Sequence, residues 1–544
     1  MEFQWGSRIT KPANCIPYER TADDPVFRPL RIFAVDPLVS QFEGAIATVQ
    51  VPYEPLKPGP VGSTMEVLCH DGYQENEPAD LDNPRVLIEN GYAPSVTNPK
   101  FHHQMTYAVA SLICAAFRKA LGRQILWGFD APRLRIRPHV PGVADACYDK
   151  ATGELRFGYS KDGDGRYVFA ALSHDVIAHE CAHALLDALR THLNLRSNPD
   201  VEAFHEGFAD LVALLQHFTY PEVVRAAIQK AGGNLARASL LTEIASVLGY
   251  NIPAAAERTG VRSGVRVEAE NVDDPHTRGS RLVVAVFDAY LTLFRRKTAP
   301  FIRLATGGTG VLPPGALPYD LVEVLAKRAS RLAEQILRIC IRAIDYCPPV
   351  DLELGEFLRA MITADRDVAP NDPYGYREAF IDAFRKQGIY PSGVSMLSED
   401  ALVWGTPEMR IPSIDDLTFA QLQFRGDPAT PASLDEIQRQ ATALGRIVTD
   451  RRYAYVFGLS PSDQGASPAS IESIRTARRI GPYESVVFDL VAEVTQVRVH
   501  DGIRVYGGST IIIDPEGRVR YSIAKNVLSR RRWEAHREYQ HDAR

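Results

Sequence analysis

The sequence predicts an α+β protein whose last part forms a separate small domain, and three features of the 544-residue chain support this. The first hundred residues are rich in Pro and Gly and carry short β-type runs between turn signals. From 173 to about 395, apolar residues recur mostly at helical spacing. Beyond 395, one helical segment is followed by strand-type runs. A chain of this length is expected to fold as two or three units.

The first part of the chain is expected to combine strands with one long helix. Strands are predicted within 44–56 and 63–70, and a helix over 98–123, where Asn98-Pro99 provides a suitable start. In 144–166, two β-type runs flank the sequence KATGE and predict a hairpin. The helical part that follows contains predicted helices at 173–190, 203–218, 279–296, 319–344 and 376–387.

The C-terminal part is predicted to pair one helix with several strands. The helix covers 432–448, and strands follow at 484–500, 503–513 and 518–526, with the turn sequence DPEG between the last two. The basic cluster Arg530, Arg531 and Arg532 predicts a charged, frayed tail, although contact with an acidic partner or nucleic acid stays open. We therefore divide the chain into a strand-rich N-terminal lobe (1–190), a mainly helical lobe (191–395) and an additional α+β domain (396–544).

The bulk composition narrows the class of protein. A net charge of -6 argues against nucleic acid as the main partner. No apolar run approaches the roughly 20 residues that cross a bilayer, and the N-terminus has no basic-then-apolar signal region. The seven cysteines are scattered without a CxxC pair, so no disulfide framework is expected. We expect a soluble cytoplasmic protein that binds neither nucleic acid nor membrane.

One helical segment, SHDVIAHECAHALLDALR at 173–190, carries two histidines with metal-ligand spacing. His179 and His183 lie four residues apart, so both imidazoles share one helix face and can bind one ion. Glu180 is about 100° around the helix from His179, which places its carboxylate beside the metal rather than on it. Alone, two histidines on a helix are more often ordinary surface or packing residues.

A second helical segment, AFHEGFADLVALL at 203–215, supplies a third candidate ligand. A catalytic zinc site needs three protein ligands and one open position. Glu206 and Asp210 lie four residues apart on one face of an otherwise apolar helix, where two carboxylates are costly unless paired or metal-bound. Glu206 is the predicted third ligand, and Asp210 is predicted to accept a hydrogen bond from the second ring nitrogen of His179.

A histidine further along the chain could stabilise negative charge. The sequence DDPHTRG (273–279) predicts a loop that ends at Ser280, a suitable N-cap for the apolar helix that follows. His276, at that helix entrance, could direct a ring N–H at a developing oxyanion. By itself, His276 is more often a loop histidine without a role.

Together these motifs resemble the thermolysin-like gluzincin metallopeptidases. The order HExxH, then ExxxD about twenty residues on, then a histidine loop is that of the family, and the likeness covers about residues 98 to 300. ADACYDKATGELRFGY is similar to the family's edge-strand segment, and DVIAHECAHALLD to its zinc helix. The resemblance implies a two-lobed fold, with a strand-rich lobe and a mainly helical lobe, and a zinc metalloendopeptidase that hydrolyses peptide or protein substrates.

The resemblance also implies roles for individual residues. One zinc ion per chain would be bound by His179, His183 and Glu206, with Asp210 as the partner of a ligand histidine. Glu180 would activate the attacking water and then carry its proton, and His276 would stabilise the oxyanion. Substrate would be bound by the strand at Asp145 and Ala146, and by Arg262.

Departures from the family pattern leave a second reading open. His217 stands where an acidic calcium ligand is expected, so calcium is not expected here, and the family's oxyanion tyrosine has no clear counterpart. No signal peptide or propeptide is evident. The alternative is a catalytically inactive gluzincin-fold binding or scaffold protein whose function lies in the C-terminal domain. The oligomeric state is open in either case.

Overall fold

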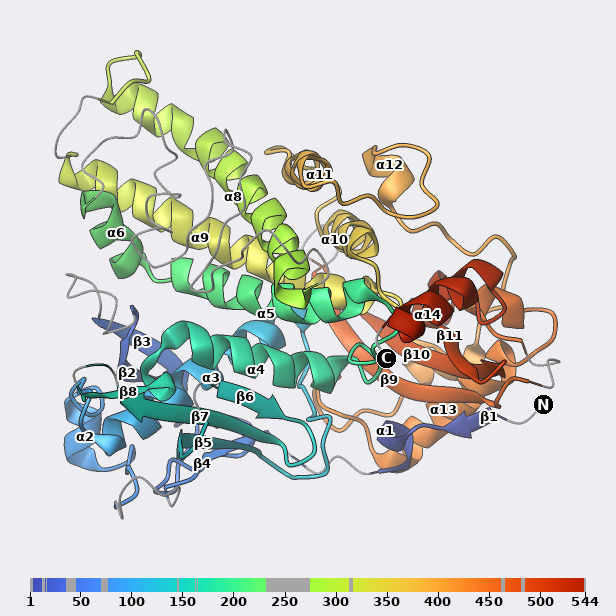
Figure 1. The fold of residues 1–544 in the computed structure, drawn as a ribbon, viewed down its shortest axis with the longest axis horizontal. Coiled ribbons are helices and arrows are strands. Elements are labelled where there is room, and N and C mark those ends of the chain that lie inside the picture. The colour runs from blue at the N-terminus through green and yellow to red at the C-terminus, as the bar shows by residue number, and fades with distance from the viewer. Residues whose placement is uncertain are drawn as a thin grey trace.

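Two neighbouring helices, α4 (His174–Leu189) and α5 (Pro199–Phe218), lie at the centre of the molecule, with strands beside α4 and further helices beside α5 (Figure 1). The computed structural model describes residues 3–11, 15, 17–35, 46–69, 77–143, 146–161, 163, 165–230, 274–312, 317–460, 465–480 and 485–542. These residues form a mixed α+β fold, as the sequence predicts.

A sheet in the N-terminal part lies against α4. Its strand order is β4-β5-β7-β6, and β8 also pairs with β7. The strands are β4 (Met65–Val67), β5 (Leu134–Val140), β6 (Ala146–Asp149), β7 (Glu154–Lys161) and β8 (Tyr167–Phe169). β6 and β7 are antiparallel, which confirms the predicted hairpin. β6 is the last strand in this order, and it packs beside α4.

The remaining N-terminal elements surround a long buried helix. The helix α3 (Pro99–Leu121) begins as predicted, with Asn98 capping its first turn and a proline at its first position. A separate two-stranded sheet, β2 (Phe27–Phe33) with β3 (Ile46–Pro52), packs against it, and α2 (Pro84–Ile88) is short. Because most of α3 is buried, it anchors both the sheets and α4 in one large core.

The helical part contains α6 (Pro221–Lys230), α8 (Pro275–Ala305), α9 (Tyr319–Ala343), α10 (Leu354–Val368), α11 (Tyr376–Lys386) and α12 (Glu399–Leu402). The predicted loop over 273–279, with Ser280 as N-cap, is wrong because α8 begins at Pro275. The Asp274 carboxylate accepts a hydrogen bond from the Thr277 N–H at 2.9 Å, and Pro275 suits the first helical position. His276 therefore lies in the first turn of α8 rather than in a loop.

The C-terminal part is built on a second sheet, ordered β1-β9-β10-β11-β12. Its elements are α13 (Leu434–Val448), β9 (Ala469–Ile480), β10 (Val486–His500), β11 (Ile503–Ile513) and β12 (Val519–Lys525). Single 3-10 turns occur at Ala170–Leu172, Ile344–Tyr346, Asp415–Leu417, Phe419–Gln421 and Ala454–Phe457. The predicted helix and strands are confirmed.

The N-terminal residues belong to this C-terminal sheet. The strand β1 (Phe3–Trp5) pairs in parallel with β9, and the short helix α1 (Ser7–Thr10) follows it. Ile9 of α1 is buried in a core shared with α13 and with Ile471 of β9. The division at 190 and 395 stays a prediction. The proposed boundaries do not include the packing of β1 and α1, from the N-terminal part, with the C-terminal sheet.

The C-terminal residues form a packed helix, α14 (Arg530–Asp542). The predicted frayed tail is wrong because Asp351, in the loop before α10, accepts the Arg532 Nε–H at 2.8 Å and lies 3.2 Å from Nε2 of His536. The Tyr539 hydroxyl donates to the Glu202 carboxylate at 2.8 Å. These contacts hold α14 against the first turn of α5.

No disulfide joins any of the seven cysteines, each of which lies in the part of the chain that the structure describes. In the described ranges no helix has both the length and the apolar character required to cross a bilayer.

A buried ion pair links the helical part to the loop after α3, and its loss should destabilise the fold. Both terminal nitrogens of Arg123 donate to the Asp345 carboxylate, and both residues are about 95% buried. We expect Asp345→Asn to lower stability by about 3–5 kcal/mol at pH 7, because it leaves the Arg123 charge buried and unpaired. Urea unfolding followed by circular dichroism measures this change.

The pH dependence of that difference follows from the Asp345 carboxyl. Burial would raise the pKa of Asp345, but Arg123 outweighs it and lowers the pKa from 3.8 to about 2. The carboxylate therefore contributes stability above the unfolded value near 4, and this contribution is lost as the pH falls towards 2. The difference between wild type and Asp345→Asn should be full at pH 7 and should narrow below pH 4. Asp400→Asn, which removes the exposed partner of Arg366, should change little; an equal effect of both variants would contradict the prediction.

Candidate metal centre

The two histidines of the HExxH motif lie on one face of α4. The opposite face of this helix is apolar and buried, with Ile177, Cys181 and Leu185 in the large core. Packing on that side fixes the rotation of the helix, so His179 and His183 must point towards α5. The Nε2 atoms of the two rings lie 2.9 Å apart. The predicted pairing of the two imidazoles is therefore found in the structure.

Glu206 reaches the same point from α5. Its Oε2 lies 3.3 Å from Nε2 of His179 and 3.6 Å from Nε2 of His183. Burial would raise the pKa of Glu206, but hydrogen bonds from the two histidines lower it well below its usual range. Glu206 is therefore an anionic ligand candidate at neutral pH, and helices α4 and α5 bring all three predicted ligands together.

The donor set fits a zinc ion. Two imidazole nitrogens and one carboxylate oxygen lie within 4.8 Å of one another. Two ligands bound at about 2.1 Å and at the tetrahedral angle are about 3.4 Å apart, close to the separations of these three atoms. Nitrogen donors combined with one carboxylate suit zinc better than calcium or magnesium, which prefer oxygen ligands.

Glu180 lies next to this group but is not part of it. The residue is 9% exposed, and the backbone of Tyr148, on the edge strand β6, lies close enough to its carboxylate to favour the charged form. Burial raises the pKa of Glu180, and the neighbouring His183 and His179 rings oppose this shift. A carboxylate whose pKa is raised by burial and that lies beside a metal site has the character of a proton acceptor.

The other ring nitrogens of both histidines have partners. Nδ1 of His179 lies 2.8 Å from Oδ1 of Asp210, which is the contact that the sequence predicts. Burial would lower the pKa of His179, but hydrogen bonds with Asp210 and Glu206 raise it to about 10. An ion bound at Nε2 must therefore displace a proton, while Nδ1–H remains to donate to Asp210.

His205 is a functional candidate that the sequence analysis missed. Its Nδ1 lies 2.7 Å from Nδ1 of His183. Burial, and then the charge on His183, lowers the pKa of His205 to about 3, so the ring is neutral and can accept a hydrogen bond. His205 thus orients His183 as Asp210 orients His179. Its position directly before Glu206 was the available signal, but helical spacing alone does not show that it faces α4.

His276 approaches the site because two glycines let α8 pack closely on α5. A Cβ on Gly207 would lie 2.5 Å from the carbonyl oxygen of Gly279, and a Cβ on Gly279 would lie 2.5 Å from that of Ala203. Only a residue without a side chain allows this backbone approach. As a result, Nδ1 of His276 lies 3.5 Å from Oε2 of Glu206, while the His276 side chain remains 59% exposed.

The structure describes one of the three predicted substrate-binding residues. Ala146 begins the edge strand β6, which packs beside α4. Asp145 and Arg262 lie outside the described residues. The alignment of a substrate along β6 therefore stays a prediction, and so does the role of Arg262.

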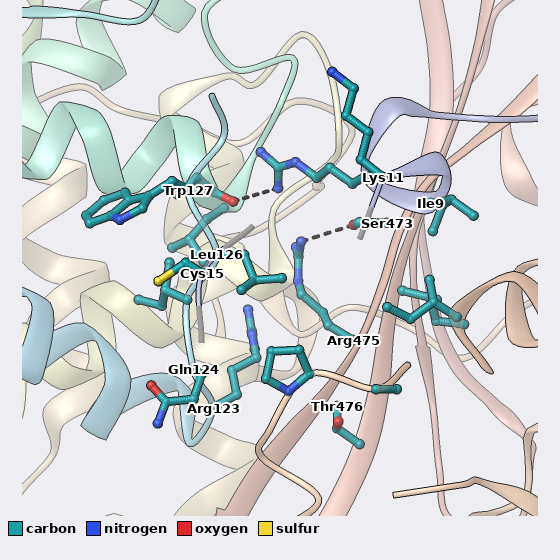
Figure 2. Close-up of a pocket in the computed structure, with 18 of the residues that line it drawn as sticks. Ile9, Lys11, Cys15, Arg123, Gln124, Leu126, Trp127, Ser473, Arg475 and Thr476 are labelled. Atoms are coloured by element: carbon teal, nitrogen blue, oxygen red, sulfur yellow. Dashed lines mark hydrogen bonds between the residues drawn. The ribbon is translucent and has the colours of Figure 1, made fainter. Parts of the chain in front are cut away.

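A large cavity occupies a different part of the molecule. It encloses about 1380 Å³ when the solvent at its open mouth is included, and it lies between the 123–131 segment, α1 and the C-terminal sheet. Figure 2 shows Arg475 and Arg123 on its wall, together with the hydrogen bond from Arg475 to Ser473. None of the metal-ligand candidates lines this cavity, so it is separate from the metal centre.

Comparison of the chain with models of protein families gave no match, and comparison with curated proteins gave no significant match. The site must therefore be interpreted from its own geometry.

Loss of the Asp210 carboxylate should weaken metal binding without removing a ligand. We expect Asp210→Ala to lower zinc affinity by about 10- to 100-fold, because His179 loses the partner that fixes its ring and tautomer. Competition with a fluorescent zinc chelator measures this change. Asp288→Ala, on α8, removes a carboxylate that pairs with Lys386 and serves as the control. Equal affinities of Asp210→Ala and wild type would exclude the proposed role of Asp210.

Proposed function

We propose that the chain is a zinc-dependent endopeptidase of the thermolysin-like gluzincin type, with a catalytic zinc ion held by His179, His183 and Glu206. One observation carries the proposal: ligand atoms from α4 and α5 converge, with Glu180 beside them and His276 next to Glu206. The two-lobed thermolysin-like architecture belongs to the same proposal. So does a cytoplasmic location, which the lack of disulfides among the seven cysteines supports.

Glu180 would handle the proton that peptide hydrolysis must move. Zinc at this position supplies Lewis acidity, which lowers the pKa of water and polarises a carbonyl group. The Glu180 carboxylate would take a proton from the attacking water and then give it to the leaving amine. Burial beside the cluster supports this role because it raises the pKa of Glu180 and so makes the carboxylate a stronger base.

His276 would stabilise charge on the former carbonyl oxygen. The residue lies in the first turn of α8 and its side chain is 59% exposed, so it can meet a substrate. A hydrogen bond from the ring N–H to the developing oxyanion is stronger in the transition state than in the ground state. This difference is the condition for accelerating the reaction. Asp210 and His205 would act as positioning residues through His179 and His183.

The edge strand β6 is the expected binding surface for an extended peptide. A strand at the edge of a sheet has backbone groups that can pair with an added strand. β6 packs beside α4, and the Tyr148 backbone lies near Glu180, so a peptide paired with this strand would pass close to the proton acceptor. This arrangement supports cleavage within a chain, and hence an endopeptidase acting on peptides or unfolded proteins.

Cleavage of a peptide library tests the proposal. We expect the zinc-loaded protein to hydrolyse internal peptide bonds, to lose this activity after treatment with a chelator, and to regain it when zinc is returned. If the protein binds zinc and cleaves no peptide in the library, the alternative of an inactive gluzincin-fold binding protein is favoured instead.

A further inference from the structure

A second cluster of metal-ligand side chains lies in the described part of the chain, at the other end of the α4–α5 contact. It consists of His174 and Asp175 at the start of α4 and of His217 near the end of α5. Because α4 and α5 are antiparallel, the start of one helix meets the end of the other. His217 is about 16 Å further along α5 than Glu206, at 1.5 Å per residue, so this second cluster is separate from the first.

The three side chains converge on one point. Oδ1 of Asp175 lies 2.9 Å from Nδ1 of His217 and 3.2 Å from Nδ1 of His174. Both histidines are 1% exposed, whereas the Asp175 side chain is 32% exposed. The imidazoles are thus fixed by packing, and the side of the cluster at Asp175 is open to solvent.

We propose that His174, Asp175 and His217 form a second divalent-metal site, which binds zinc or a similar transition-metal ion and joins α4 to α5. Two imidazole nitrogens and one carboxylate oxygen suit such ions, whereas calcium requires mainly oxygen ligands. The distances from the carboxylate to the two nitrogens are close to the roughly 3.4 Å expected between neighbouring ligands of a tetrahedral zinc ion. Water at the exposed side can complete the coordination.

The surroundings of His174 support this role. Its Nε2 lies 3.1 Å from the Tyr220 hydroxyl, so the nitrogen that faces away from the cluster has a hydrogen-bond partner. Metal-binding histidines commonly have such a partner, which fixes the orientation of the ring. Gln216 in turn donates to the same hydroxyl. The ring of His174 is therefore held with Nδ1 towards Asp175.

The proposed ion would stabilise the two helices that carry the catalytic ligands. The first cluster joins the middle of α4 to α5, and the second joins the start of α4 to the end of α5. The expected metal content of the chain rises accordingly, from one equivalent to two. This inference does not depend on peptidase activity.

Zinc content of four proteins tests the second site. Each is saturated with Zn²⁺, freed of loose metal by gel filtration and analysed by mass spectrometry. We expect two equivalents in wild type, one in His183→Ala, one in His217→Asn and none in the double variant. His102→Asn, which alters a buried histidine outside both clusters, should retain two equivalents.

Two results of the zinc analysis would contradict the second site. No zinc in a folded His183→Ala, or equal zinc in His183→Ala and the double variant, would overturn the second site and leave the first untouched. If His217→Asn does not fold, Asp175→Asn replaces it, because it keeps the shape of the side chain. Added zinc should also raise the thermal unfolding midpoint of His183→Ala but not that of the double variant; equal shifts would count against the site.

Discussion

Replacement of Glu180 by Gln is expected to lower kcat for peptide hydrolysis by about 10²- to 10⁴-fold while zinc remains bound. The amide occupies the same space but cannot accept the proton of the attacking water. In the proposed site Glu180 is not a metal ligand, because His179, His183 and Glu206 supply the three converging donor atoms. Initial rates with a fluorogenic peptide, measured alongside zinc content, give both quantities.

A second Glu-to-Gln substitution on α5 separates the loss of the Glu180 carboxylate from a general effect of the substitution on the fold. Glu202→Gln lies one turn before Glu206 on α5 and alters contacts with Arg196 and Tyr539. It should keep wild-type activity. Retention of wild-type kcat by Glu180→Gln would remove Glu180 from the mechanism, whereas loss of zinc from that variant would make it a ligand or a structural residue.

His183→Ala is expected to abolish peptide hydrolysis and to remove one equivalent of zinc. The substitution leaves only His179 and Glu206 of the three ligands, too few for a stable catalytic zinc site. It also leaves His205 without the ring that it contacts at 2.7 Å. Zinc analysis and peptide cleavage on the same preparation test this expectation.

His183→Gln provides a milder comparison, because a glutamine side chain fills part of the space of the imidazole. It too should lose the catalytic ion. Full activity in either variant, at wild-type zinc content, would show that hydrolysis does not use this site.

Local sequence patterns predicted the elements of the site well because helix geometry relates near neighbours. The four-residue spacings of His179 with His183, and of Glu206 with Asp210, each define one helix face, and the structure turns these faces towards each other. The hairpin that ends in β6 was equally local. Such features depend on few residues and are specified by periodicity.

Apart from the convergence of Glu206 and Asp210 on the HExxH histidines, features that depend on contacts between distant segments were not predicted. His205 is a partner of His183 only because α4 and α5 are antiparallel neighbours. The close packing of Gly207 on Gly279, which brings His276 to the site, also requires knowledge of both helices. Likewise, β1 pairs with β9 across more than four hundred residues. No periodic pattern in one segment encodes a partner in another.

The central claim is that His179, His183 and Glu206 share one ion. A crystal structure of the zinc-loaded protein, with anomalous data collected on both sides of the zinc absorption edge, tests it most directly. We predict an anomalous peak about 2.1 Å from Nε2 of both histidines and from the Glu206 carboxylate, with a fourth position open to solvent. A zinc-loaded crystal with no peak between these residues, or with a protein side chain in the fourth position, would contradict the account.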